Sequence, residues 1–316
     1  MAEQTMKNGS ARICLITGGT SGIGAATALQ LARYGITVVI VGRNLRRCIR
    51  QVQSIRRKVP NARVEYLVAD LSSQQEVRHL ASEFTARYHS LDILINNAGA
   101  YFGKREISVD GVEMSFALNH MAYFLLTNLL VDSLKKSTDG RVVVVSSGAH
   151  VNGTIDFNDL QTVKNYSAMK AYSQSKLANL LFTYALGRRL KGTRVTVNAL
   201  DPGFVATNLG SNNNWLRTRL RNLLKRTMLR PAEGARTVVY LATSPEVDGV
   251  SGQYFYECRP IRSSDGSYDE TIAEKLWTLS EELSRGMPAE RTLNDGNNMI
   301  IHTTRSKHSL LNESIQ

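Results

Sequence analysis

Short runs of β-branched and aliphatic residues alternate along this chain with stretches of helical periodicity. The seven strand-like runs are Ile13–Thr17, Thr37–Val41, Val64–Val68, Ile93–Asn96, Val142–Ser146, Val195–Leu200 and Gln253–Tyr256. The first helix is predicted from about Gly22 to Tyr34, directly after a glycine-rich turn. Strands that alternate with helices form a parallel sheet covered on both faces. The sequence therefore predicts an α/β fold, built as a single doubly wound domain.

Length and composition fit one large unit. The chain has 316 residues, of which 42% are hydrophobic, and it shows no internal repeat or interdomain linker. We expect an N-terminal extension at residues 1–10 and one domain at residues 11–285. Residues 286–316 are polar and lack periodicity, so we expect them to form a flexible tail.

The segments that would direct the chain out of the cytoplasm are not recognisable. Residues 1–10 lack the apolar stretch of a signal peptide, and no run reaches the roughly 18 consecutive apolar residues of a membrane span. The three cysteines, Cys14, Cys48 and Cys258, are too few and too scattered for a disulfide framework or a zinc site. We therefore expect a cytoplasmic protein with reduced thiols and no metal.

Two arginine-rich segments contribute to the net charge of +12. One contains Arg43, Arg46, Arg47, Arg50, Arg56, Arg57 and Lys58, and the other contains Arg217, Arg219, Arg221, Lys225, Arg226 and Arg230. Neither forms one long basic block or shows the aromatic–basic interleaving of single-strand binders. We expect no nucleic-acid partner, and we interpret most of these side chains as solvated.

A glycine loop joins the first predicted strand to the first predicted helix. Gly18, Gly22 and Gly24 let the backbone turn tightly and approach a pyrophosphate at the positive helix N-terminus. The spacing is Gly-x-x-x-Gly-x-Gly rather than the more common Gly-x-Gly-x-x-Gly. A glycine loop alone can be a simple turn, but its place after the first strand of an alternating chain favours nucleotide binding.

The end of the second strand bears on the choice of cofactor. An NAD site usually places an acid there, against the ribose 2′-hydroxyl. Gly42 stands at that position and Arg43 follows it. The missing carboxylate removes repulsion against a 2′-phosphate, and a guanidinium would bind that phosphate, so we predict NADP(H). The alternative is an ordinary surface arginine, and Arg46 and Arg47 are further candidates for the same contact.

Tyr172 and Lys176 are four residues apart in a predicted helix, so they share one helix face. A free phenol has a pKa of about 10, which makes it a poor acid or base at neutral pH. A nearby ammonium stabilises the phenolate and is expected to lower that pKa. The pair is a candidate general acid/base, although the spacing is common in helices that have no such role.

Taken together, the motifs resemble the short-chain dehydrogenase/reductase family from about residue 11 to residue 260. They are the glycine loop, Asp70-Leu71, Asn96–Gly99, Asn119, Ser147, Tyr172, Lys176 and Pro202-Gly203. The resemblance implies a Rossmann-type domain with a seven-stranded parallel sheet, whose C-terminal strand edge joins cofactor and substrate. Finer matches are similar to retinol dehydrogenases, which implies a lipophilic carbonyl or alcohol substrate; they are Asn119–Thr127, Val145–His150, Tyr172–Asn179, Tyr254–Cys258 and Ala273–Trp277.

The resemblance also implies residue roles. Tyr172 would exchange a proton with the substrate oxygen, Lys176 would lower the tyrosine pKa and bind the nicotinamide ribose, and Asn119 would hold a water. Ser147 would hold the substrate oxygen, with Ser146 as its rival. The implied cofactor-binding residues are Gly18, Thr20, Ser21, Gly22, Ile23, Gly24, Arg43, Asp70, Leu71, Asn97, Ala98, Gly99, Tyr172, Lys176, Pro202, Gly203, Val205 and Thr207. His120 and His150 are interpreted as packing or pocket-lining residues.

The segment at about 208–230 is expected to be a substrate lid. Apolar residues recur there at helical spacing from Trp215 to Met228, opposite arginines and lysines with no acid. A sharper hypothesis is that residues 215–230 also rest on an anionic membrane surface. The resemblance further implies pairing into a homodimer or homotetramer through the helices that carry Asn119 and Tyr172.

The function predicted from these features is NADP(H)-dependent interconversion of a lipophilic aldehyde or ketone and its alcohol, with reduction favoured. One alternative is an NAD-dependent alcohol dehydrogenase, which the Gly42-Arg43 pair disfavours. The other is a non-catalytic NADP-binding sensor or interaction protein. Such proteins commonly lose the tyrosine or the lysine, whereas this chain keeps Tyr172 and Lys176.

Overall fold

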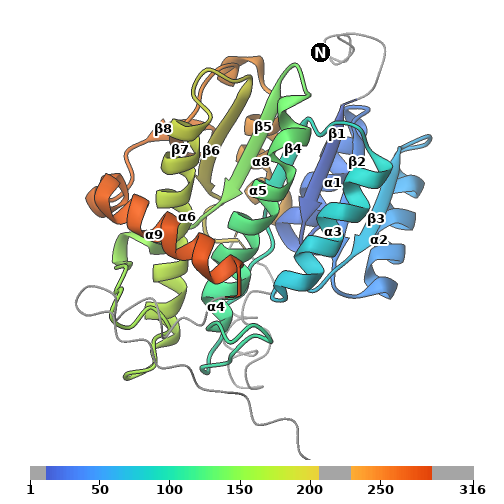
Figure 1. Ribbon diagram of the computed structural model, residues 1–316. Helices are drawn as coiled ribbons and strands as arrows, with labels where there is room; N and C mark the ends of the chain where they lie inside the picture. Colours follow the sequence, from blue (N-terminus) through green and yellow to red (C-terminus); the bar gives the residue numbers. More distant parts are fainter. Residues whose placement is uncertain (1–11, 206–228, 287–316) are drawn as a thin grey trace, which may run out of the picture.

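A computed structural model describes residues 12–205 and 229–286 of the chain (Figure 1). Its centre is one sheet with the strand order β3-β2-β1-β4-β5-β6-β7-β8. The strands are β1 (Ile13–Thr17), β2 (Thr37–Gly42), β3 (Val64–Val68), β4 (Ile93–Asn96), β5 (Gly140–Val145), β6 (Val195–Asp201), β7 (Gln253–Tyr256) and β8 (Arg259–Ile261). The predicted seven parallel strands are confirmed, and each begins and ends within two residues of the sequence-based range.

An eighth strand, β8, was not predicted. It pairs antiparallel with β7 after a two-residue turn at Glu257 and Cys258, both of which have positive φ values, of 49° and 62°. Glycine or asparagine is the usual signal for such a turn, and neither residue is present. The strand is also short, exposed and interrupted by Pro260, as is typical of a sheet edge.

Two layers of helices cover the two faces of the sheet. The main helices are α1 (Gly22–Arg33), α2 (Leu45–Lys58), α3 (Gln74–Arg87), α5 (Ala122–Lys135), α6 (Ala168–Arg189), α8 (Pro231–Thr243) and α9 (Glu270–Ser284). One core cluster joins the sheet to α3, α5, α6 and α9, and the other joins it to α1, α2 and α8. Within β1, Leu15 belongs to the first cluster and its neighbours Cys14 and Ile16 to the second. This alternation explains why the central strands are apolar throughout.

A continuous helical run from Met114 to Lys135 precedes β5. It consists of the short α4 (Met114–Phe116), a π-helical turn at Ala117–Met121 and α5. Its length and a mean hydropathy of 1.3 would allow it to cross a membrane, but 72% of that apolar window is buried inside the fold. The run is therefore accounted for as a core helix, packed against α3 and the sheet.

Helix α9 lies across α6 and α5 (Figure 1). The indole of Trp277 stacks on Phe182 at a centroid distance of 5.8 Å and meets the edge of Phe124 at 4.9 Å. The guanidinium of Arg189 covers the indole from 3.9 Å. The chain's own helix thus occupies part of the surface of α5 and α6, the helices through which pairing was expected, and that pairing stays a prediction.

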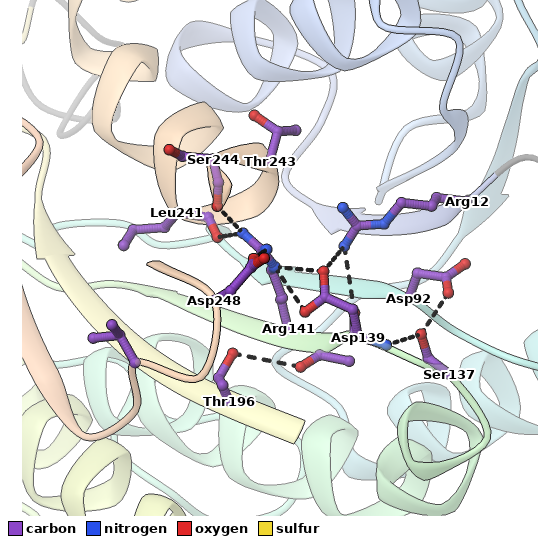
Figure 2. Close-up of polar contacts among 12 residues, drawn as sticks. Arg12, Asp92, Ser137, Asp139, Arg141, Thr196, Leu241, Thr243, Ser244 and Asp248 are labelled. Carbon is purple, nitrogen blue, oxygen red and sulfur yellow. Dashed lines mark hydrogen bonds and ion pairs between the residues drawn. The ribbon is translucent and has the colours of Figure 1, made fainter. Parts of the chain in front are cut away.

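A buried arginine ties together the ends of several elements at the N-terminal end of β5 (Figure 2). The side chain of Arg141 is 4% exposed and pairs with Asp139 and Asp248. Its Nη1 donates to the carbonyl oxygens of Leu241 and Ser244, at 3.2 and 2.8 Å, at the C-terminal end of α8. A guanidinium suits this place because the last helix carbonyls lack intrahelical donors and carry partial negative charge.

We expect Arg141→Met to lower the free energy of unfolding by about 3 kcal/mol, because two buried carbonyls and two carboxylates lose their common donor. The two carboxylates are partly hydrated, at 38% and 58% exposure, which keeps the loss below that of a fully buried pair. Equilibrium urea unfolding measures the effect. Arg12→Met is the control: among the described residues, the side chain of that arginine forms polar contacts only with Asp139, so a loss of about 1 kcal/mol or less is expected. Equal losses in the two variants would contradict the assignment.

Candidate active site

The glycine loop turns between β1 and α1 as predicted. Gly18 and Gly22 have positive φ values of 66° and 55°, which favour glycine. A Cβ atom at Gly24 would lie 2.4 Å from the carbonyl oxygen of Gly18, so no side chain fits there. The N-cap of α1, Ser21, makes no side-chain cap hydrogen bond, which leaves the first N–H groups of the helix available to an anion. The loop therefore has the shape and the donors that a pyrophosphate needs.

The end of β4 is fastened to this loop through Thr17. Its hydroxyl accepts hydrogen bonds from the backbone N–H groups of Asn97 and Ala98, at 2.9 and 3.0 Å. The Asn97 amide donates back to the Thr17 carbonyl at 2.8 Å. These contacts bring the predicted residues Asn97, Ala98 and Gly99 beside the glycine loop.

Asp70 and Leu71, which the resemblance implies would contact the adenine of the cofactor, are only partly available. The side chain of Leu71 is 6% exposed and belongs to the core, so a ligand can meet little more than its backbone. One carboxylate oxygen of Asp70 accepts hydrogen bonds from the N–H and hydroxyl of Ser72, at 3.0 and 2.7 Å. The other oxygen of Asp70 accepts no hydrogen bond from the residues that the structure describes.

At the end of β2, the structure gives a steric reason for the glycine. A Cβ atom at Gly42 would lie 2.6 Å from Thr20 Cγ2, so the acid typical of NAD sites would collide with the loop. Arg43 is exposed and has no ion-pair partner among the described residues. Arg46 and Arg47 are exposed in the first turn of α2, which contains no acid. This end of the sheet thus presents three exposed arginines.

Asn119 lies in the π-helical turn before α5 and is fully buried. Its amide nitrogen donates to Ala100 O and to Ser175 Oγ, both at 3.0 Å, and its oxygen accepts from Ala100 N at 2.9 Å. Both amide protons are therefore used within the protein. For the predicted water, the side chain offers the remaining lone pair of Oδ1.

Tyr172 and Lys176 lie on one face of α6, as their spacing predicts. The Lys176 ammonium donates to the Val145 carbonyl at 3.1 Å and lies 5.6 Å from the centre of the Tyr172 ring. Both side chains are almost fully buried. A Cβ atom at Gly99 would lie 3.5 Å from Lys176 Nζ, so the end of β4 reaches the same place. Four predicted parts of the site therefore lie together at the C-terminal edge of the sheet: the glycine loop, Asn97–Gly99, Asn119 and the Tyr172–Lys176 pair.

The structure distinguishes the two candidate serines. Ser146 is buried, and its hydroxyl donates to the Lys176 carbonyl at 2.9 Å, which commits it to the backbone of α6. Ser147 is half-buried, and its hydroxyl acts on Tyr172, where it lowers the phenol pKa. Ser147 also caps the 3₁₀ helix Gly148–Asn152 by accepting from Ala149 N at 3.2 Å. Ser147 is thus the serine that faces the tyrosine.

The expected pKa shift of Tyr172 is wrong in direction. Burial raises the pKa of Tyr172 to about 12, and the Ser147 hydroxyl offsets only part of that increase. Burial likewise lowers the pKa of Lys176 to about 8. Spacing along a helix reveals that the two groups share a face, but it does not reveal how far both are removed from water. In this fold, desolvation is the largest contribution to the pKa shift of both groups.

Asp201, the last residue of β6, is a site residue that the sequence reasoning missed. One carboxylate oxygen accepts from Gly203 N at 2.9 Å, and the other would lie 2.9 Å from a Cβ atom at Gly148. Its negative charge raises the pKa of both Tyr172 and Lys176. An acid at a strand end directly before Pro202-Gly203 was the available signal.

The remaining predicted residues follow β6. Gly203 has a φ of 77°, and Val205 is buried and forms a parallel bridge with Leu229. Pro202 lies between Asp201 and Gly203 at the same strand end. Thr207 and the lid at 208–230, apart from its last two residues, lie outside the described part of the chain.

Comparisons with known proteins agree with this geometry. The sequence model of the family described as short chain dehydrogenase matches residues 12–216. Human retinol dehydrogenase 14 is 44% identical over 283 residues, which cover 84% of each chain. Human polyprenol dehydrogenase is 40% identical, over 86% of this chain and 85% of its own.

Two solved structures extend the comparison. An uncharacterised protein from Mycobacterium paratuberculosis has a TM-score of 0.70 and 36% identity, over 87% of this chain and 93% of that one. The Pseudomonas aeruginosa RhlG/NADP active-site complex has a TM-score of 0.62 and 27% identity, over 77% of this chain and 93% of that one.

We expect Asp201→Asn to move the pKa of Lys176 further below about 8, because the carboxylate that favours the ammonium is removed. An asparagine oxygen can still accept from Gly203 N, so the turn is kept. NMR titration of ¹³C-labelled lysine measures the shift. The control is Asp156→Asn, which removes the partner of exposed Lys170 and should leave Lys176 unchanged. An unchanged Lys176 pKa in Asp201→Asn would contradict the role given to Asp201.

Proposed function

The chain belongs to the short-chain dehydrogenase family, and from that premise we propose that it is an NADP(H)-dependent reductase of lipophilic aldehydes or ketones. The reverse reaction is oxidation of the corresponding alcohol. The observation that carries the proposal is the convergence of Tyr172, Lys176, Ser147 and Asn119 beside the glycine loop. A protein that only sensed the cofactor would not need this set of proton-handling groups.

The residues present fit a nicotinamide cofactor. The turn at Gly18–Gly24 and the free N-terminus of α1 would hold the pyrophosphate, and Asn97–Gly99 would flank the adenosine ribose. Asp70 and the backbone of Leu71 would meet the adenine, while Pro202–Val205 and Thr207 would hold the carboxamide. When bound, the reduced cofactor supplies the hydride.

The protein's own part is to hold and move a proton. Ser147 would hold the carbonyl oxygen of the substrate, and the phenol of Tyr172 would donate its proton to that oxygen. A tyrosine pKa of about 12 keeps the phenol protonated at neutral pH but makes it a weaker acid than a free phenol, so its proton would be transferred as negative charge develops on the substrate oxygen. Lys176, with a pKa of about 8, is mostly charged at neutral pH and can return a proton toward Tyr172.

The preference for NADP(H) is supported by the end of β2. The collision between any side chain at position 42 and Thr20 disfavours the acid that binds a ribose 2′-hydroxyl. The exposed guanidinium of Arg43 could bind a 2′-phosphate instead. The NADP complex of the similar P. aeruginosa protein is consistent with this choice.

A lipophilic substrate is consistent with exposed apolar side chains in the segments that carry site residues. Phe204, Val151 and Met169 are 65%, 63% and 52% exposed, and each lies within four residues of a site residue in sequence. Exposed apolar side chains are suited to contact with apolar ligands. The names of the similar human proteins, retinol dehydrogenase and polyprenol dehydrogenase, point to the same substrate class.

The remaining expectations stay predictions. They are the domain at residues 11–285 with a flexible tail, a cytoplasmic location, a homodimer or homotetramer, and contact of residues 215–230 with a membrane surface. The tail and most of the 215–230 segment lie outside the described residues, and the structure contains one chain.

Replacing Tyr172 with phenylalanine should lower kcat for carbonyl reduction by about 10²–10⁴-fold, the usual contribution of general acid catalysis. The Kd for NADPH, followed by cofactor fluorescence, should change little because the ring and its packing remain. An NADPH-consumption assay across retinal, steroids, quinones, aromatic ketones and aliphatic aldehydes first selects the substrate. Retention of most turnover in the variant would refute the role of Tyr172.

Arg43→Ala should raise the KM for NADPH about tenfold while leaving the KM for NADH unchanged, since only NADPH carries the phosphate that the guanidinium would bind. Steady-state kinetics with each cofactor at saturating substrate measure the difference. Arg57→Ala, an exposed arginine at the other end of α2, is the matched control and should affect neither cofactor. Equal losses with NADPH and NADH in Arg43→Ala would remove the argument for NADP(H).

A further inference from the structure

His150 is buried directly beside the serine that faces Tyr172. It lies in the 3₁₀ helix Gly148–Asn152, with only 2% of its surface exposed. Its Nδ1 lies 2.8 Å from the carbonyl oxygen of Ser147, and its Nε2 lies 3.1 Å from the backbone nitrogen of Ser264. A carbonyl can only accept and a backbone N–H can only donate. The ring is therefore neutral, with its proton on Nδ1.

Ser264 is itself held in place by hydrogen bonds. Its carbonyl accepts from the Ser267 hydroxyl at 2.6 Å, and that hydroxyl shares a 2.6 Å hydrogen bond with Ser263. Ser263 also contacts the hydroxyl of Tyr184 on α6 at 2.6 Å, and Tyr184 stacks on Tyr268. A segment more than a hundred residues further along the chain, anchored on the helix of Tyr172, thus holds the far side of the imidazole.

The near side of the imidazole restrains Ser147. The Ser147 carbonyl accepts from the Nδ1 of His150 and also from its backbone N–H at 3.1 Å. Ser147 begins the 3₁₀ helix, and its hydroxyl accepts from Ala149 within the same turn. The direction of that hydroxyl therefore depends on how firmly the turn is held. The edge contact of His150 with Tyr254, at 5.0 Å, is packing that any aromatic ring could supply.

We propose that His150 is a positioning residue, which fixes Ser147 for the substrate oxygen only while its imidazole is neutral and hydrogen-bonded to Ser264. The inference rests on the proposed reductase function. It assigns to a buried histidine a role beyond the packing expected from the sequence. It also links the rate of reduction to a segment, Ser263–Tyr268, that reaches the site through His150 and α6.

Protonation of the ring would break the arrangement. A proton on Nε2 would face the N–H of Ser264. Two donors would then meet, and the hydrogen bond between Ser264 and His150 would break. Burial lowers the pKa of His150, while the Ser147 carbonyl and Asp201 raise it, and the net shift is downward. This hydrogen bond is therefore expected to break at a pH below the ordinary histidine pKa of about 6.5. The titratable groups near the ring are Asp201 on β6 and Tyr254 on β7, with Tyr172 on α6 beyond Ser147.

Three variants test the proposal by their kcat, KM and pH–rate profiles. His150→Phe keeps an aromatic ring but loses both hydrogen bonds, so kcat should fall about tenfold with little change in the Kd for NADPH. His150→Gln can donate to Ser147 and accept from Ser264 without titrating. It should restore most of kcat and remove the loss of activity at acid pH.

Arg141→Met is the control for a loss of stability alone. It removes a buried side chain at the opposite end of β5 that contacts neither His150 nor Ser147. It should lower stability while leaving kcat and its acid limb as in the wild type. The proposal would be overturned if His150→Gln kept the wild-type acid limb, or if Arg141→Met reduced kcat as much as His150→Phe does.

NMR separates failure of this inference from failure of the proposed function. In ¹⁵N-histidine-labelled wild-type protein, His150 should show the neutral form with the proton on Nδ1. The backbone of Ser147 and Ala149 should become more mobile in His150→Phe. Both readouts are independent of turnover, so absence of reductase activity alone would reject the proposed function. A proton on Nε2 at neutral pH, or unchanged Ser147 mobility in His150→Phe, would reject the positioning role.

Discussion

Parallel pairing of the central strands is the constraint on which the rest of this structure depends. In a parallel sheet the carboxyl ends of all the strands lie at the same edge. Residues that are far apart in sequence therefore meet there. The register that pairs Val145 with Leu200 brings Ser146 and Ser147 beside Asp201. The pairing of β4 with β5 brings Asn97 to the same edge. Asn119 in the π-helical turn before α5, with Tyr172 and Lys176 on α6, then completes the site from one face.

Burial, more than charge pairing, sets the chemistry at this edge. Lys176 is an ammonium inside the protein, held by a single backbone carbonyl and by the charge of Asp201. Tyr172 is a phenol whose ionisation is opposed by the same burial. Both shifts come from the loss of water, and both favour neutral forms. A tyrosine in this environment stays protonated at neutral pH and forms the phenolate with difficulty.

Most of the elements could be predicted from the sequence, because their signals are local. The apolar runs of β1 to β7, the glycine loop and the four-residue spacing of Tyr172 and Lys176 all act within a few residues. Strand β8 was not predicted because its turn uses Glu257 and Cys258 instead of glycine or asparagine. The contributions of Asp201 and of Ser264, the partner of His150, were not predicted because each acts through neighbours that are distant in sequence.

By itself, the sequence determined the alternating fold, the glycine loop and the placement of Tyr172 and Lys176 on one helix face, since these follow from residue type and short-range spacing. Only the tertiary structure decided which serine faces Tyr172, in which direction the pKa of Tyr172 shifts, and that α9 covers part of α5 and α6. The physical reason is that burial and long-range hydrogen bonds are properties of the packed chain. Spacing can bring two groups to one helix face, but the packing around them determines how they ionise.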